Sequence, residues 1–144
     1  MKAALSNVGY VMMAFGIAGL VLSHSAFSPM AVVVAGQALA IGLMIWARVT
    51  FGRRSFHATA TPTEGGLVTT GPYRFIRHPI YASVCLFAWV SAVGNPSVLS
   101  IGLAAAVSLG AAIRIRTEES LLRARYPEYA AYARRTRRLV PFVF

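Results

Sequence analysis

A long uncharged stretch near the N-terminus limits what this chain can fold into. No Lys, Arg, Asp or Glu occurs between Lys2 and Arg48. A helix needs about 20 mostly apolar residues to cross a hydrocarbon core of about 30 Å. The stretch is therefore long enough for two membrane-spanning helices and too long for one. Ser23, His24 and Pro29 mark the turn between them.

The first 25 residues also admit a second interpretation, a removable signal peptide. The apolar run from Ala3 to Leu22 is longer than the apolar core of a usual signal peptide, and Lys2 is its one basic flank. The sequence around Ala26 resembles a cleavage site only weakly. These features favour a retained helix.

The composition extends this interpretation to the whole chain. Of 144 residues, 57% are hydrophobic and 12% are charged, whereas a soluble domain has about 25% charged residues. We therefore predict a single-domain, all-α integral membrane protein with about four transmembrane helices and a cytoplasmic C-terminal helical segment. The predicted spans cover about 6–22, 30–47, 79–93 and 97–113, with a loop over 48–78 and a helical tail over 114–144 that breaks at Pro127.

The basic residues predict the orientation. With four spans, all 14 Lys and Arg residues fall on the side that holds both termini and the middle loop. The turns around His24 and Asn95, on the other side, contain none. The positive-inside rule makes the basic side cytoplasmic. Orientation and contact with anionic lipids thus explain the net charge of +10, and nucleic acid is not an expected partner.

A first motif, Gly71–Tyr81, leads into the third span. Pro79 suits the first turn of a helix, where its missing N–H has no partner to lose. The free N–H groups that follow, together with Arg77, offer a place for an anion such as a carboxylate or phosphate. Membrane anchoring is the alternative role for Arg77, and helix capping the alternative role for His78. The scattered histidines predict no metal site.

A second motif follows the fourth span, where two of the four acidic residues are adjacent, Glu118 and Glu119. Neighbouring helix positions point about 100° apart, so one carboxylate is expected to face the bundle while the other pairs with an arginine. Carboxylates near membrane depth are costly unless paired. A ligand site and a simple Arg–Glu pair both satisfy this requirement. The antiparallel third and fourth spans bring the two motifs to the same membrane face.

The tail contains a third pattern. Leu121, Leu122, Arg125, Tyr129 and Tyr132 fall near one helical face. Taken alone, this pattern predicts an amphipathic segment on anionic lipid, with its tyrosines at the level of the headgroups.

Together these motifs resemble the isoprenylcysteine carboxyl methyltransferase family, which is related to the phospholipid N-methyltransferases. The resemblance covers about residues 69–141, roughly half the chain. It rests on the motifs Gly71-Pro72-Tyr73, Arg77-His78-Pro79-x-Tyr81, Glu118-Glu119-x-x-Leu122, Tyr126-Pro127-Glu128-Tyr129-x-x-Tyr132 and Arg138-x-x-Pro141. Ser83 departs from the family pattern, in which a glycine is frequent at this position.

The resemblance implies a membrane-embedded enzyme that binds S-adenosylmethionine at the cytoplasmic end of the last hairpin and tail. It implies catalytic roles for His78, as the one candidate base, and for Arg138, as a contact to the acceptor's polar group. Glu118 and Glu119 would bind the amino-acid or ribose portion of the cofactor. The full set of implied cofactor-binding residues is Tyr73, Arg77, His78, Pro79, Tyr81, Glu118, Glu119, Tyr129 and Tyr132.

The implied acceptor is a lipophilic or amphiphilic molecule with a carboxylate, amine or thiol. Two other functions remain open: a sterol-reductase-like membrane oxidoreductase that uses NADPH, and a non-enzymatic membrane scaffold whose basic tail binds lipid. No protein partner is indicated. Thirteen arginines against one lysine suggest a GC-rich bacterial genome, and the inner membrane is then the expected location.

Overall fold

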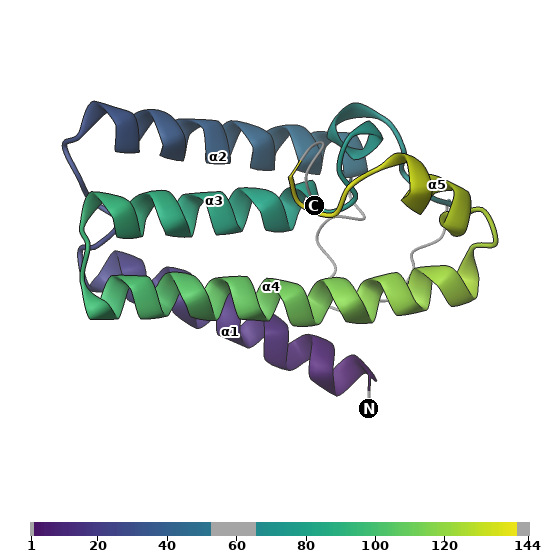
Figure 1. The fold of residues 1–144 in the computed structure, drawn as a ribbon, viewed down its shortest axis with the longest axis horizontal. Coiled ribbons are helices and arrows are strands. Elements are labelled where there is room, and N and C mark those ends of the chain that lie inside the picture. Colours follow the sequence, from purple (N-terminus) through teal and green to yellow (C-terminus); the bar gives the residue numbers. More distant parts are fainter. Residues whose placement is uncertain (1, 53–65, 141–144) are drawn as a thin grey trace.

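The computed structural model describes residues 2–52 and 66–140 of the chain. The elements are α1 (Lys2–Leu22), α2 (Ala31–Phe51), the short 3₁₀ helix η2 (Gly71–Arg74), α3 (Pro79–Gly94), α4 (Val98–Arg125) and α5 (Tyr129–Arg135) (Figure 1). A single bridge between Ile76 and Arg137 is the one β-type pairing among the described residues. The predicted all-α class is confirmed.

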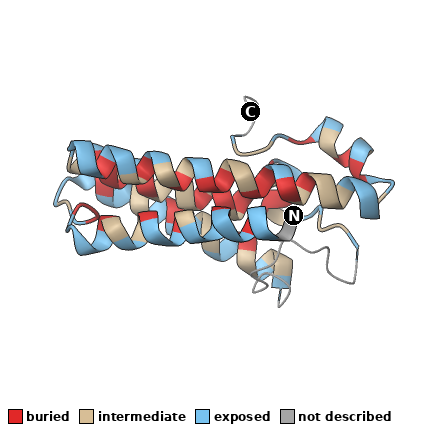
Figure 2. Cartoon of the chain, turned by 90° about the horizontal axis from the view of Figure 1, so that it is seen from below, coloured by how far each residue is buried: buried red, intermediate tan, exposed pale blue. Residues whose placement is uncertain are grey.

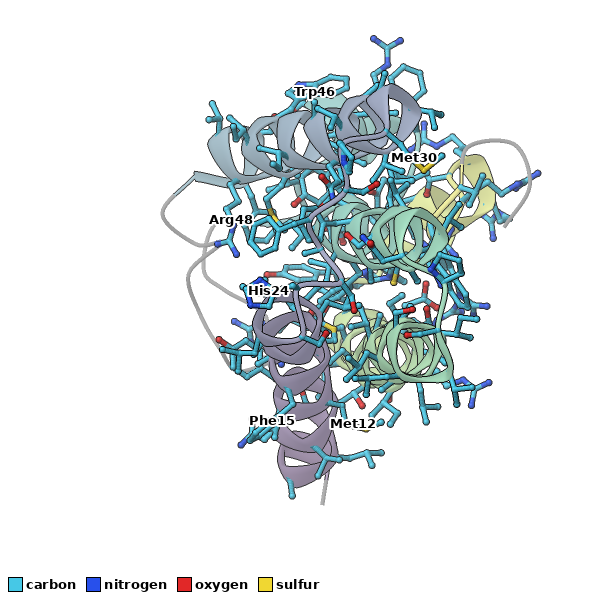
Figure 3. All side chains as sticks on the ribbon, turned by 90° about the vertical axis from the view of Figure 1, so that its left-hand side faces the viewer. Met12, Phe15, His24, Met30, Trp46 and Arg48 are labelled. Atoms are coloured by element: carbon cyan, nitrogen blue, oxygen red, sulfur yellow. The ribbon has the colours of Figure 1, made fainter. Side chains whose placement is uncertain are left out.

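The four long helices pack in the spatial order α2, α3, α4, α1. α2 packs mainly against α3, α3 also packs against α4, and α1 packs mainly against α4. The end view shows α1 and α2 at opposite edges, with Phe15 and Trp46 pointing outwards (Figure 3). The central hairpin α3–α4 is therefore flanked on each side by one N-terminal helix.

Small side chains allow these helices to approach closely. Ala104, Val107 and Ala111 of α4 are completely buried, and a Cβ atom at Gly16 of α1 would come within 2.5 Å of Val107 Cγ2. Buried residues line the facing surfaces of the helices, and exposed residues lie outside (Figure 2). Many exposed residues are large and apolar, for example Leu22 at 79% exposure. Tight small-residue interfaces with an apolar exterior are typical of helices packed in lipid.

The helix lengths agree with membrane crossing. Three helices, α1, α2 and α4, are long and apolar enough to span a membrane, and α3 is a shorter apolar helix of 16 residues. α4 has 28 residues and is therefore about 42 Å long, more than the roughly 30 Å of a hydrocarbon core. The C-terminal end of α4 extends beyond the start of α3 (Figure 1).

Two helices continue beyond the apolar spans predicted within them. The fourth predicted span ends at residue 113, and the tail after it is predicted to be helical up to a break at Pro127. α4 indeed continues unbroken to Arg125, and the break falls at Tyr126 and Pro127. Arg, Glu and Leu are good helix formers that carry the helix past the apolar stretch. Likewise, α2 continues to Phe51, beyond the predicted span end at residue 47.

The tail differs more. The helix breaks at Tyr126 and Pro127, and α5 folds back towards η2 (Figure 1). Tyr129 and Tyr132 are 1% and 7% exposed, so both tyrosines pack inside the protein rather than on lipid headgroups. The other residues of the predicted face are less covered: Leu121 and Leu122 are half-buried and Arg125 is exposed.

At the other end of the bundle, hydrogen bonds fasten the turns. The amide of Asn95 donates to the carbonyls of Ser25 (3.0 Å) and Phe27 (2.9 Å). Gln37 Nε2 on α2 donates to the Ala26 carbonyl (2.8 Å) and to Ser91 Oγ on α3 (3.0 Å). These contacts tie α2 and α3 to the turn that follows α1.

We expect Gln37→Leu to lower the free energy of unfolding by about 1 kcal/mol, because interhelical hydrogen bonds in membrane proteins contribute about that much. The measurement is an unfolding titration in mild detergent. Leu39→Ala, at a 66% exposed position of the same helix, is the control and should stay within about 0.5 kcal/mol of wild type. Equal stability of Gln37→Leu and wild type would contradict the expectation.

Candidate functional site

The structure brings the two sequence motifs and the tail together at one end of the bundle. The segment before α3 pairs with the segment after α5: the Arg77 N–H donates to the Arg137 carbonyl (2.7 Å) and the His78 N–H to the Arg138 carbonyl (3.1 Å). This pairing places His78, at the start of α3, beside the last third of α4. The site thus has three walls: the α3 start, α4 and the tail.

Glu119 is the centre of this site. Its side chain is 6% exposed, and its carboxylate accepts a hydrogen bond from Arg77 Nε at 3.0 Å. Arg138 Nη2 lies 3.2 Å from Oε2, and His78 Nε2 lies 3.4 Å from Oε1. A carboxylate this deeply buried requires such partners, because charged hydrogen bonds offset its loss of hydration.

Glu118 occupies the other side of the histidine ring. Its Oε2 lies 3.7 Å from His78 Nδ1. Its Oε1 accepts from Arg114 Nη2 at 3.2 Å and also from the Tyr81 hydroxyl. The sequence predicted that one glutamate would face the bundle while the other paired with an arginine. In the structure both glutamates pair with arginines. The His78 ring lies between the two carboxylates, with one ring nitrogen near each of them.

Arg77 connects the site to the tail. Besides Glu119, its guanidinium donates to the Ala133 carbonyl (2.9 Å) and to the Thr136 carbonyl. These two carbonyls belong to the last turn of α5 and the residue after it, where backbone acceptors lack helical partners. The Arg77 side chain therefore joins the tail to the Glu119 carboxylate.

The tyrosines form the packed side of the site. The Tyr132 hydroxyl donates to the Tyr73 carbonyl at 2.7 Å. Burial raises the pKa of Tyr73 and of Tyr132, so both hydroxyls stay protonated at neutral pH. Burial, and then the negative charge of Glu119, raise the pKa of Tyr129 to about 12. The buried Tyr129 hydroxyl thus lies close to the Glu119 carboxylate.

An open cleft adjoins Glu119. It has a volume of about 600 Å³ and is lined by Arg116, Glu119, Ser120, Arg123, Ala124 and Arg138. Three of these residues are arginines and one is a carboxylate, so the cleft carries excess positive charge. The hydrogen bond and charge of Glu119 raise the pKa of Arg138, which remains a cation. The cleft suits a ligand that carries an anionic group and also offers donors to Glu119.

The structure thus gathers nearly all the predicted site residues. Tyr81 and Glu118 lie on one side of His78, and Arg77, Glu119 and Arg138 on the other. Pro79 is buried at the first position of α3 and sets where that helix starts.

Sequence reasoning missed Arg114. It counted Arg114 among the arginines that orient the protein, yet the residue is 4% exposed and bonds to Tyr81 and Glu118. The signal was present: Arg114 and Glu118 are four residues apart on one helix, the spacing at which side chains meet. The cleft is also lined by Arg116, Ser120 and Arg123, none of which was among the predicted site residues.

In the part of the chain that the structure describes, no group of three or more His, Cys, Asp or Glu residues is placed to hold a metal ion.

Comparison with known proteins identifies relatives. The family model described as phospholipid methyltransferase matches residues 30–129. The cobalt-zinc-cadmium resistance protein CzcN of Cupriavidus metallidurans is 31% identical over 140 residues, which cover 94% of this chain and 62% of CzcN. The nickel-cobalt-cadmium resistance protein NccN of Alcaligenes xylosoxydans xylosoxydans is 44% identical over 79 residues, which cover 52% of this chain and 36% of NccN. The chain thus spans less than two thirds of either relative. No solved structure matches.

We expect Arg77→Lys to loosen the tail, because a lysine ammonium cannot reproduce the planar set of bonds to Glu119, Ala133 and Thr136. The loss should be about 1–3 kcal/mol of local stability, since a charged hydrogen bond is removed from a buried acceptor. Hydrogen exchange of α5 is the measurement. Arg74→Lys, at an exposed position three residues earlier, is the control. Unchanged α5 protection in Arg77→Lys would contradict the role given to this side chain.

Proposed function

The chain belongs to the phospholipid methyltransferase family, and on that premise we propose that it is a membrane methyltransferase that uses S-adenosylmethionine to methylate a lipophilic acceptor. The observation that carries the proposal is the placement of Glu118 and Glu119 on opposite sides of His78, beside an arginine-lined cleft. These groups come from the residues matched by the family model, apart from the tail arginine Arg138.

The residues present fit this cofactor. S-adenosylmethionine carries an ammonium, a carboxylate, ribose hydroxyls and a positive sulfonium. Glu119 offers acceptors for the ammonium or the hydroxyls, and Arg123 and Arg138 offer donors for the carboxylate. The Tyr129 hydroxyl, buried near Glu119, is a further polar group at this position.

When bound, the cofactor supplies an electrophilic methyl group on a positively charged sulfur. The protein's task is then to hold the acceptor nucleophile in line with that methyl and to exclude water. The tail, held by Arg77, closes the side of the site next to the Tyr73 and Tyr132 rings.

The acceptor's class determines the need for a base. A carboxylate acceptor attacks without losing a proton, whereas an ammonium or a thiol must first give one up. His78 lies between two carboxylates and is the residue we assign to that transfer. Arg138, whose side chain is 39% exposed, is placed to contact the acceptor's polar group while still paired with Glu119. The largely apolar exterior of the helices favours an acceptor that arrives through lipid.

We place the site on the cytoplasmic face of a bacterial inner membrane. The N-terminus, the end of α2, the start of α3 and the end of α4 lie towards one end of the bundle (Figure 1), and the arginines gather there. Contact with anionic lipids would follow from this charge.

Calorimetric titration of the detergent-purified protein with S-adenosylmethionine, and with its demethylated product, tests the proposal. We expect binding to wild type, and a loss of affinity of about tenfold or more in Glu119→Gln, because one charged contact is removed. Glu128→Gln removes a carboxylate from an exposed position outside the cleft, four residues after Ala124, the last cleft residue on α4, and its affinity should equal that of wild type.

Binding would lead directly to a screen of lipophilic acids, amines and thiols as acceptors. A well-folded wild type that binds NADPH instead would replace the proposal with the oxidoreductase alternative. A protein that binds neither nucleotide would favour the scaffold alternative.

A contribution to metal resistance is a second candidate function, favoured by the names of both relatives. We expect a host that expresses the wild-type chain to tolerate more cobalt, cadmium, nickel or zinc than a host that expresses Glu119→Gln at the same level. Growth across a concentration series of each salt is the measurement, with Glu128→Gln as the matched control. Equal tolerance in the wild-type, Glu119→Gln and Glu128→Gln strains would contradict a role of this site in metal resistance.

A further inference from the structure

Helix α1 lies outside the residues that the family model matches, yet it touches the site. The contact is set by two glycines. A Cβ atom at Gly9 of α1 would lie 2.7 Å from the Gly110 carbonyl oxygen and 2.9 Å from Arg114 Cγ, and a Cβ atom at Gly110 would lie 2.6 Å from the Gly9 carbonyl oxygen. The two helix backbones are therefore as close here as two glycines allow.

One turn beyond this contact, α1 holds the side chain of Arg114. The guanidinium donates to the Ser6 carbonyl at 3.4 Å, and its carbon lies 5.5 Å from the centre of the Tyr10 ring. Ser6 is completely buried. Arg114 thus rests against the inner face of α1 rather than pointing to solvent.

The other edge of the same guanidinium reaches the site. Arg114 Nε donates to the Tyr81 hydroxyl on α3 at 2.7 Å, and Nη2 donates to Glu118 at 3.2 Å. The Tyr81 hydroxyl in turn donates to Glu118. One planar group therefore joins α1, α3 and α4 and fixes the carboxylate that faces His78.

We infer that Arg114 is a positioning residue for the methyltransferase site and that α1, through its close contact at Gly9 and Gly110, sets where Arg114 holds Tyr81 and Glu118. This inference rests on the proposed function. The guanidinium is planar and its partners lie on three helices, so a shift of α1 must break a bond on one side or carry Tyr81 and Glu118 with it. A lysine at this position keeps the charge but cannot bond to all three partners at once.

The test compares Gly9→Ala with Gly102→Ala. A Cβ atom at Gly102 of α4 meets nothing within 4 Å, so this variant adds the same methyl group without moving α1. In protein labelled with ¹³C at the tyrosine ring carbon that bears the hydroxyl, the Tyr81 signal is assigned by its loss in Tyr81→Phe. We expect this signal to shift in Gly9→Ala and in Arg114→Lys, and to stay in place in Gly102→Ala. An unmoved signal in Gly9→Ala overturns the inference, whether or not the protein binds a cofactor.

Cofactor affinity provides the second readout. We expect Gly9→Ala and Arg114→Lys each to weaken S-adenosylmethionine binding by about tenfold, and the double variant to be no weaker than Arg114→Lys, because both changes act through one group. A purely structural role would lower the unfolding temperature while leaving the affinity of the folded variants unchanged, and would overturn the inference. If Gly9→Ala folds poorly, Tyr10→Leu takes its place, since it removes the ring beside Arg114 without adding atoms at the helix contact.

If wild type binds no S-adenosylmethionine but the Tyr81 signal still shifts in Gly9→Ala, the proposed cofactor fails while the positioning of Tyr81 by α1 stands. If wild type binds and the signal does not shift, the proposed function stands and this inference fails.

Discussion

The buried carboxylate of Glu119 is the interaction on which the rest of the site depends. Its partners Arg77, His78 and Arg138 come from the start of α3 and from the tail, so a single charge joins segments about 20 to 40 residues apart in sequence. Without Arg77 and Arg138 the carboxylate would be uncompensated in a packed interior, a state that costs several kcal/mol. Docking of the tail and burial of Glu119 are therefore one event.

The second carboxylate makes a different connection. Glu118 bonds to Arg114 and Tyr81, which are packed among the long helices rather than in the tail. The histidine ring stands between a carboxylate held by the tail and a carboxylate held by the bundle. A movement of the tail or of the helix bundle would therefore change the surroundings of His78. Ser6 is connected to the histidine through Arg114 and Glu118, and Arg138 is connected to it through Glu119.

Much of this arrangement could be predicted from sequence. Apolar length predicted the bundle, Pro79 predicted the start of α3, and the antiparallel hairpin predicted that Gly71–Tyr81 would meet the paired glutamates. The helical continuation past the fourth span, with its break at Pro127, was predicted as well, and α4 ends at Arg125 directly before that break. The burial of Tyr129 and Tyr132 could not be predicted from periodicity. Periodicity identifies an apolar face, but lipid and protein cover such a face equally well.

Arg114 was missed for a related reason. An arginine just past an apolar helix serves equally well as an anchor in the headgroup region and as a buried partner, and the choice depends on what lies opposite. Here the opposite surface is α1, which lies more than 100 residues earlier in the chain and approaches closely because Gly9 has no side chain. The sequence contains both halves of the contact, but only the packing of α1 on α4 brings them together.

The same packing explains why a site for a polar donor and a lipophilic acceptor would lie at this level of the bundle. α3 begins at Pro79, while α4 continues for a further length beyond that point (Figure 1). The arginine-lined cleft lies along this extension, and the apolar parts of the helices lie on the other side of the start of α3. His78, at the N-terminal boundary of α3, lies where the arginine-lined cleft adjoins the apolar helices. Because α4 is longer than α3, the polar end of α4 continues past the point where α3 begins. Glu118 and Glu119 lie at this point, beside His78.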